Sequence, residues 1–224
     1  MRRLDPRNLL PLLLALTGCD GVLADVACGI TADSSDKSAT TPSGYFPAHL
    51  SRPTVACDGK CIAPIDDFVD EWYSKQLRAA DEPSLFRLSQ RPVKAGDFVL
   101  RFTWLRSFDP SMFITLRRQG GRFELIAREL SGAGGYEPGA VRRSVRRPLS
   151  PAAAQALLAA IDPDALFAGP TALCDRGCDG SEWLFEIVDH RGYRIVNRWS
   201  PEHGPVHRAG RALIARTGWP VEVY

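Results

Sequence analysis

The chain has 224 residues, with 28 lysines and arginines against 26 aspartates and glutamates, so its net charge is only +2. Nucleic-acid binding depends on a basic excess that releases counterions from phosphates, and this balance argues against such a partner. The patterned part of the chain, residues 62–224, is long enough for one domain with its own core.

Residues 1–18 combine a basic start of three arginines with a short apolar run over residues 9–16. The run is shorter than the roughly 20 residues that a membrane-spanning helix needs. It ends in Leu16-Thr17-Gly18-Cys19, and this order of features resembles a bacterial lipoprotein signal peptide.

The resemblance implies that residues 1–18 are removed and that Cys19 carries a lipid anchor, since two or more acyl chains hold a protein stably on a bilayer. We then expect a protein on the cell membrane, facing the periplasm, and Asp20 favours the inner membrane. An ordinary signal peptide cut after Ala24 is the alternative, and it would discard Cys19. Without residues 1–18, the chain keeps 25 basic and 25 acidic residues.

Residues 19–61 are expected to form a lipidated, mostly flexible tether. The segment 33–44 is polar and small, and such a composition buries too little apolar surface to offset the entropy of ordering. Residues 45–47, Tyr-Phe-Pro, are the exception, and we expect them to dock onto the body as a fringe. The globular domain is predicted to span 62–224.

Two cysteine pairs share one spacing, Cys57 with Cys61 and Cys174 with Cys178. In an oxidising compartment, cysteines so close in sequence favour disulfides, and the spacing predicts a bridge within each pair. Cys28 is left over. It is either free, or it displaces one partner of the first pair.

Hydrophobic periodicity predicts the elements of the body in chain order. They are a helix over 66–80, a strand from 97, a hairpin of 112–118 and 122–128, a strand over 139–148, a helix over 151–161, a hairpin of 183–188 and 193–199, and a helix over 205–216. Strands joined by short hairpins, with helices before, between and after them, predict a single α+β domain on an antiparallel sheet of five or six strands.

A glycine-rich stretch over residues 131–139 is the first candidate site. Such a loop cradles phosphate when it leads into a helix. This one leads into a predicted strand, so a wide loop between strands is the better interpretation. Its Tyr136 and Glu137 are candidate binding residues, because loops on a rigid sheet often carry function.

The second candidate is the stretch Asp179–Glu186, which reads Asp-Gly-x-x-Trp-x-x-Glu and is followed by Arg198-Trp-Ser-Pro. This pattern resembles one that recurs in bacterial proteins of unassigned function, over about residues 98–199. No reaction is known for these proteins, so the resemblance implies no activity for this chain.

Alternation along this hairpin places Glu186 on the face opposite Trp183. If arginines of the next strand, such as Arg198, meet the acids, they form a cross-strand ladder of salt bridges. The functional alternative puts Asp179, Glu186, Arg198 and His190 around a groove, as binding residues or as the centre of a periplasmic hydrolase.

A metal carrier and a serine hydrolase are weaker alternatives for the function. The set Cys174, Cys178, His203 and His207 offers ligands for zinc, but the spacer between its halves is much longer than in a classical finger. Membrane-anchored copper-delivery proteins also use two cysteines at this spacing. Ser181 with the histidines has no Gly-x-Ser-x-Gly context for a catalytic triad. We therefore expect no resident metal or cofactor.

Arginines concentrate on one predicted strand, at Arg142, Arg143, Arg146 and Arg147. They form either a solvated sheet face or a contact for anionic lipid or an acidic protein, with Arg142 and Arg146 as candidates. The sequence thus favours a non-catalytic binding, inhibitor or immunity-type lipoprotein with an envelope protein as partner.

Overall fold

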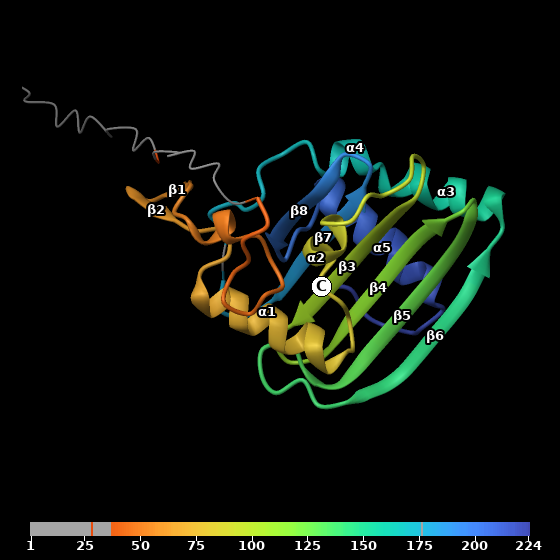
Figure 1. Ribbon diagram of the computed structural model, residues 1–224. Coiled ribbons are helices and arrows are strands. Elements are labelled where there is room, and N and C mark those ends of the chain that lie inside the picture. Colours follow the sequence, from red (N-terminus) through yellow and green to blue (C-terminus); the bar gives the residue numbers. More distant parts are fainter. Residues whose placement is uncertain (1–27, 29–36, 176) are drawn as a thin grey trace, which may run out of the picture.

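The computed structural model describes residue 28 and residues 37–175 and 177–224 (Figure 1). Residues 1–18, which we expect to be a signal peptide, lie outside the described residues together with Cys19 and Asp20. Within the described part of the chain, no helix is long and apolar enough to cross a membrane.

The predicted α+β class is confirmed, with a six-stranded antiparallel sheet, a small two-stranded hairpin and helices on both faces of the sheet. The strands are β1 (Val55–Cys57), β2 (Lys60–Ile62), β3 (Phe98–Arg106), β4 (Pro110–Gln119), β5 (Arg122–Ala133), β6 (Val141–Leu149), β7 (Ser181–Asp189) and β8 (Gly192–Trp199). The helices are α1 (Asp67–Ala79), α2 (Leu85–Ser89), α3 (Pro151–Ile161), α4 (Pro163–Leu166) and α5 (Gly204–Thr217), with a 3₁₀ turn at Ala48–Ser51.

The order of strands in the large sheet is β6-β5-β4-β3-β7-β8. Strands β3 to β6 follow one another as a meander, and the chain then passes through α3 and α4 to return beside β3 as β7. In this central pairing Phe102 lies opposite Phe185, with their rings stacked at 4.6 Å. The hairpin of β3 and β4 and the hairpin of β7 and β8 therefore share one core.

One face of the sheet packs against α3 and α5, which lie behind the strands in Figure 1. The centre of this core is Trp183, which is 1% exposed. A Cβ at Gly210 of α5 would lie 2.2 Å from the Trp183 ring, so this glycine lets the helix approach the sheet closely. The helix is followed by Gly218 in a left-handed conformation, which glycine adopts without strain.

The other face packs against α1, whose Tyr73 and Leu77 are fully buried. Asp66 caps this helix by accepting a hydrogen bond from the Val69 amide at 2.9 Å. Because both faces are covered here, β3 is buried on both sides, whereas its alternation predicts one strongly buried face.

Residues 40–50 also belong to this second core. The expected docking of residues 45–47 is confirmed, whereas the order of the residues beside them differs from the expectation of a mostly flexible tether. Phe46 is 0% exposed and its ring meets Tyr73 edge to face. The buried Asp70 carboxylate accepts hydrogen bonds from the Thr41 hydroxyl and from the amide and hydroxyl of Ser43. One apolar anchor and one buried acceptor thus order a stretch that is polar by composition.

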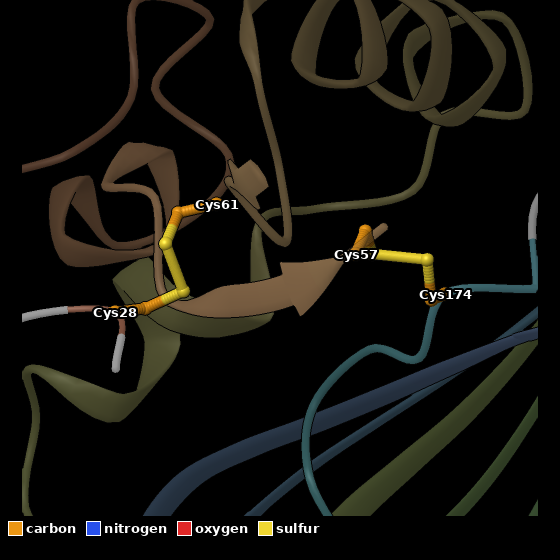
Figure 2. The surroundings of a disulfide bond; sticks show 4 residues. All are labelled: Cys28, Cys57, Cys61 and Cys174. Carbon is orange, nitrogen blue, oxygen red and sulfur yellow. A yellow bond between two sulfur atoms is a disulfide. The ribbon is translucent and has the colours of Figure 1, made fainter. Parts of the chain in front are cut away.

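The disulfides differ from the predicted pairing (Figure 2). Cys28 is bonded to Cys61 and Cys57 to Cys174, while Cys178 is an exposed free thiol. The prediction of one bridge within each pair is therefore wrong, and the alternative in which Cys28 displaces a partner holds.

The hairpin of β1 and β2 explains why Cys57 does not bond to Cys61. Cys57 lies opposite Lys60, and Cys61 lies opposite Ala56. Side chains alternate between the faces of a strand, so the two cysteines point to opposite sides of the hairpin. One side meets Cys28 and the other meets Cys174 (Figure 2).

Candidate functional site

An open cleft of about 410 Å³ lies between α1, the glycine-rich loop after β5 and the start of β7. We call it the aromatic cleft and define it by six of the side chains that line it. They are Phe68, Trp72, Tyr136, Cys178, Glu182 and Trp199.

Helix α1 supplies the first wall of the aromatic cleft. Its apolar stripe buries Val69 and Tyr73 against the sheet, which leaves Phe68 and Trp72, one turn apart, at the edge of that stripe. Their ring centroids are 6.2 Å apart. Phe68 is 74% exposed, which is unusual for so large an apolar side chain and marks a surface for contact.

The glycine-rich loop supplies the second wall, and α1 holds it by side-chain hydrogen bonds. The Trp72 indole donates to the Gly134 carbonyl at 2.6 Å. The Gln76 amide donates to the carbonyls of Gly134 and Tyr136 at 3.1 and 3.2 Å. At the rim, Lys75 forms an ion pair with Glu137 at 3.0 Å.

The glycines in this loop allow close approach of two backbones. A Cβ at Gly134 would lie 2.6 Å from the Arg106 amide nitrogen, and one at Gly135 would lie 2.8 Å from the Ser107 carbonyl oxygen. The loop therefore lies flat on the end of β3, where the Gly134 amide donates to the Arg106 carbonyl. It leads into β6 and not into a helix, which confirms the predicted wide loop between strands.

The floor comes from β7 and β8, where Glu182 lies directly opposite Trp199. Glu182 lines the aromatic cleft and is only 4% exposed. The Trp199 ring packs against the chain at Gly177, where a Cβ would lie within 2.4 Å of the indole nitrogen. Cys178 follows and brings its thiol to the same opening.

The charged side chains of the aromatic cleft take part in ion pairs. Glu71 and Glu182 line the cleft together with one base, Lys75. Lys75 pairs with the exposed Glu137, and Glu71 pairs with Arg78. The aromatic rings rather than an excess of one charge therefore distinguish the cleft.

Of the predicted binding residues, Tyr136 lines the cleft and Glu137 lies at its rim. Asp179 is exposed and lies next to Cys178 in the chain. Glu186 is 0% exposed and binds Arg101 of β3, while the Tyr193 hydroxyl donates to it at 2.9 Å. Glu186 is thus part of the buried interior.

The predicted ladder that pairs Glu182 and Glu186 with arginines of β8 is wrong, although Arg194 does form an ion pair with Asp189 at 2.8 Å. Arg194 lies opposite Ile187, and Arg198 lies opposite Trp183. The arginines therefore share a face with the apolar residues of β7, while Glu186 points to the other face. Arg198 instead donates to the carbonyls of Pro170 and Thr171, in the segment beside β8.

The structure does not bring Asp179, Glu186 and His190 together. Asp179 precedes β7 and His190 follows it, and β7 has nine residues, so its ends lie about 25 Å apart. Glu186 lies between them with its carboxylate in the buried network. The arrangement lacks the convergence that the hydrolase alternative requires.

The four side chains of the zinc alternative do not form a metal site either. Cys174 is in a disulfide, so it offers no thiolate, and His207 lies against the Trp183 ring at 5.9 Å. Among the described residues, no group of three or more His, Cys, Asp or Glu side chains is arranged to hold a metal ion.

The arginines of β6 lie at the open edge of the sheet, at the opposite end of the strand order from β8. Arg142 and Arg143 both bind Glu129, and Arg146 is 3.9 Å from Glu124. Because these two acids offset part of the positive charge, the strand is a partly neutralised, solvated edge. A role for Arg142 and Arg146 in binding lipid or protein stays a prediction.

Sequence reasoning missed Phe68, Trp72, Cys178, Glu182 and Trp199 as parts of one site. The signal for Phe68 was present, because a phenylalanine beside the apolar stripe of an amphipathic helix has to be exposed. No protein-family model matches the chain, and no curated protein matches it either.

Proposed function

We propose that this protein is a non-catalytic binding protein of the bacterial cell envelope, anchored by lipid on Cys19 and facing the periplasm. An inhibitor or immunity-type role toward an envelope protein is the form we favour. Asp20 favours the inner membrane within this proposal.

The observation that carries the binding role is the aromatic cleft. Protein-binding surfaces are enriched in aromatic side chains that fill pockets at the centre of an interface. Phe68 and Tyr136 present such rings to solvent, 74% and 61% exposed, on a helix and a loop fastened to each other. A partner would therefore meet a surface that is already in its binding conformation, which lowers the entropic cost of association.

The two disulfides support the proposed location in the periplasm. Disulfides persist in oxidising environments such as the periplasm and are rare in the cytosol. The two disulfides connect residues 33 and 117 positions apart, so they close long loops and are typical of structural bridges.

The anchor is tested by metabolic labelling with radioactive palmitate. We expect label in the wild-type protein and in Cys178→Ser, and none in Cys19→Ser. Label that persists in Cys19→Ser, or that is missing from the wild-type protein, contradicts lipid anchoring at this residue.

The cleft is tested by chemical cross-linking in intact membranes followed by purification of the protein. We expect a defined partner with the wild type and with Leu173→Ala, which alters an exposed apolar side chain outside the cleft. The double variant Phe68→Ala/Tyr136→Ala should lose that partner while keeping its thermal stability. A partner retained by the double variant contradicts the proposal that the aromatic cleft binds it.

If the partner is a toxin or a lytic enzyme, adding the purified protein should inhibit the activity of that partner. The inhibition should rise with the fraction of the partner that is bound. The same double variant should fail to inhibit. Inhibition that survives both substitutions would show that another surface is responsible.

A further inference from the structure

We infer that the outer side of α3 and α5 is a second interaction surface, and that it binds an acidic helix of another protein. The two helices lie behind the sheet in Figure 1, on the face opposite α1. We call this side the α3–α5 surface and define it by its exposed residues Ala152, Gln155, Ala156, Ala159, Arg208 and Arg211. The aromatic cleft borders α1, so this inference goes beyond the proposed role of the cleft and does not depend on it.

Helix α3 contributes an outer side without charge. The helix is buried through Leu157 and Ile161, and its opposite side is exposed. A surface helix ordinarily carries charged residues on the exposed side, but α3 has no charged residue along its whole length. Because its exposed positions are mainly alanines, a second helix can approach α3 more closely than it could approach a helix with long side chains.

Helix α5 contributes positive charge beside the uncharged helix. The two helices pack against each other, and Arg208 and Arg211 lie one turn apart on the exposed side of α5. Helix α5 contains no acid, and neither guanidinium forms an ion pair with a described residue. Like charges one turn apart on a helix repel each other, so this pair of arginines does not serve the stability of α5.

His207 reports the local charge independently. Its pKa lies below the ordinary value, first because burial disfavours the charged form and then because Arg211 and His203 carry the same charge. Glu202, just before the helix, is exposed and forms no ion pair with the arginines of α5 in the described part of the chain. The α3–α5 surface therefore carries an excess of positive charge.

An acidic helix suits both halves of the α3–α5 surface. Its small side chains can pack on the alanines of α3 while its carboxylates reach Arg208 and Arg211 of α5. Hydrogen bonds between guanidinium and carboxylate groups are roughly twice as strong as those between neutral groups. Opposite charges across an interface also speed association and exclude partners of the wrong charge.

A membrane and a second copy of the chain fit this surface less well. Helices that lie in a membrane interface bury bulky residues such as tryptophan, phenylalanine and leucine, whereas the outer side of α3 offers alanine and glutamine. In a symmetric dimer a second copy would present the same surface, and neither helix has an acid to pair with the arginines.

The experiment uses the full-length protein in the cells that naturally produce it. The photoreactive amino acid benzoylphenylalanine replaces Gln155, which flanks the alanines, so the probe reports contact without covering them. The control carries the same probe at Gln90, an exposed glutamine at the end of α2. After illumination, mass spectrometry identifies the cross-linked segment of the partner.

We expect the probe at Gln155, but not the one at Gln90, to label a helical protein segment with acidic residues on the labelled side. A synthetic peptide of that segment should bind Arg208→Gln/Arg211→Gln about tenfold more weakly than the wild type, because two exposed ion pairs are lost. The variant Arg91→Gln/Lys94→Gln removes two exposed bases outside the surface and should bind normally. Added salt should weaken binding to the wild type.

A matched peptide with its acids replaced by lysine should bind the wild type poorly and bind Arg208→Glu/Arg211→Glu better. Labelling of lipid alone, or of nothing at Gln155, would overturn the inference. Equal binding of the acidic peptide to the wild type and to Arg208→Gln/Arg211→Gln would overturn it as well. If a variant unfolds on heating earlier than the wild type, the two peptides on the wild type decide alone, and equal binding refutes the role of charge.

These outcomes are separate from those of the aromatic cleft. The variant Phe68→Ala/Tyr136→Ala should leave labelling from Gln155 unchanged, because the cleft borders the opposite face of the sheet. Loss of this labelling in that variant would show that the α3–α5 surface is not an independent surface, and would overturn the inference.

Discussion

Arg101 of β3 and Glu186 of β7 face each other across the centre of the sheet, and both are fully buried, with the arginine Nε 3.0 Å from the Glu186 Oε2. Burial opposes the charge on Arg101, but Glu186 and Glu82 raise its pKa above the ordinary value. Glu82 lies just beyond α1 and also binds Arg128 of β5. One buried network thus joins that helix end to three strands.

Arg101→Met should destabilise the protein by about 3–5 kcal/mol, because it leaves Glu186 buried without its cation and leaves Glu82 with Arg128 alone. Urea unfolding measures the loss. The double variant Arg101→Met/Glu186→Leu should recover a large part of it, since a buried pair replaced by apolar groups is often neutral. A double variant as unstable as Arg101→Met would contradict the assignment of the cost to an unpaired charge.

Stability should depend on pH through Asp189. Burial favours the neutral acid, but hydrogen bonds from the Arg191 side chain and amide, with the charges of Arg194 and Arg191, lower the pKa of Asp189. A lowered pKa in the folded state means that this stabilisation is present above the unfolded value of about 4 and is lost as the pH falls through the folded value.

We therefore expect Asp189→Asn to be less stable than the wild type at neutral pH and to approach it below pH of about 4. Thermal unfolding across the acid range provides the comparison. A constant difference between the two proteins at every pH would exclude a role for this ionisation.

Trypsin should reveal the disulfide pairing, because it cleaves after Lys60 and Arg176, between the members of each close pair. After alkylation of free thiols without reductant, we expect linked peptides that join Cys28 to Cys61 and Cys57 to Cys174. Cys178 should be alkylated. A linked peptide that joins Cys174 to Cys178 would contradict the structure.

Removing the two bridges should have unequal effects. By loop entropy alone, Cys57→Ala/Cys174→Ala should lose up to about 5 kcal/mol and Cys28→Ala/Cys61→Ala up to about 4 kcal/mol, because the first loop is longer. Chemical denaturation of both variants tests the order. The reverse order would show that a factor other than loop length dominates.

Gly134→Ala should destabilise the protein by about 1–3 kcal/mol, since the new Cβ would meet the backbone of Arg106, which cannot move aside. Gly169→Ala is a suitable control, because its nearest neighbour is the end of the Arg198 side chain at 3.4 Å. Equal stability of both variants in thermal unfolding would contradict the close approach of the loop to β3.

The sequence predicts the long elements well, because each has a clear local period and its own boundary residues. Ser150 precedes α3 and caps it, with the Ala153 amide 3.2 Å from its hydroxyl. The short elements α2, α4 and the hairpin of β1 and β2 have no such period. Five or fewer residues give too little pattern to separate a strand or helix from a loop.

The error in the last hairpin was avoidable from the sequence. With Asp189 paired to Gly192, a two-residue loop sets the register, and Glu186 then falls opposite Ile195 rather than an arginine. The partner of Glu186 is Arg101, 85 residues away, which no local pattern indicates. The cleft likewise depends on contacts between α1 and a loop about 60 residues later, such as Trp72 with Gly134.

If the protein is anchored by lipid, the bond between Cys28 and Cys61 limits how far the domain can stand from the bilayer. If Cys19 holds the lipid, only nine residue steps separate the acylated thiol from a point fixed to the folded body, a leash of at most about 30 Å. The second bridge ties the same hairpin to Cys174, four residues before Cys178 in the chain. Such a short leash would keep the opening beside that thiol close to the membrane, within reach of partners whose exposed segments lie near the lipid headgroups.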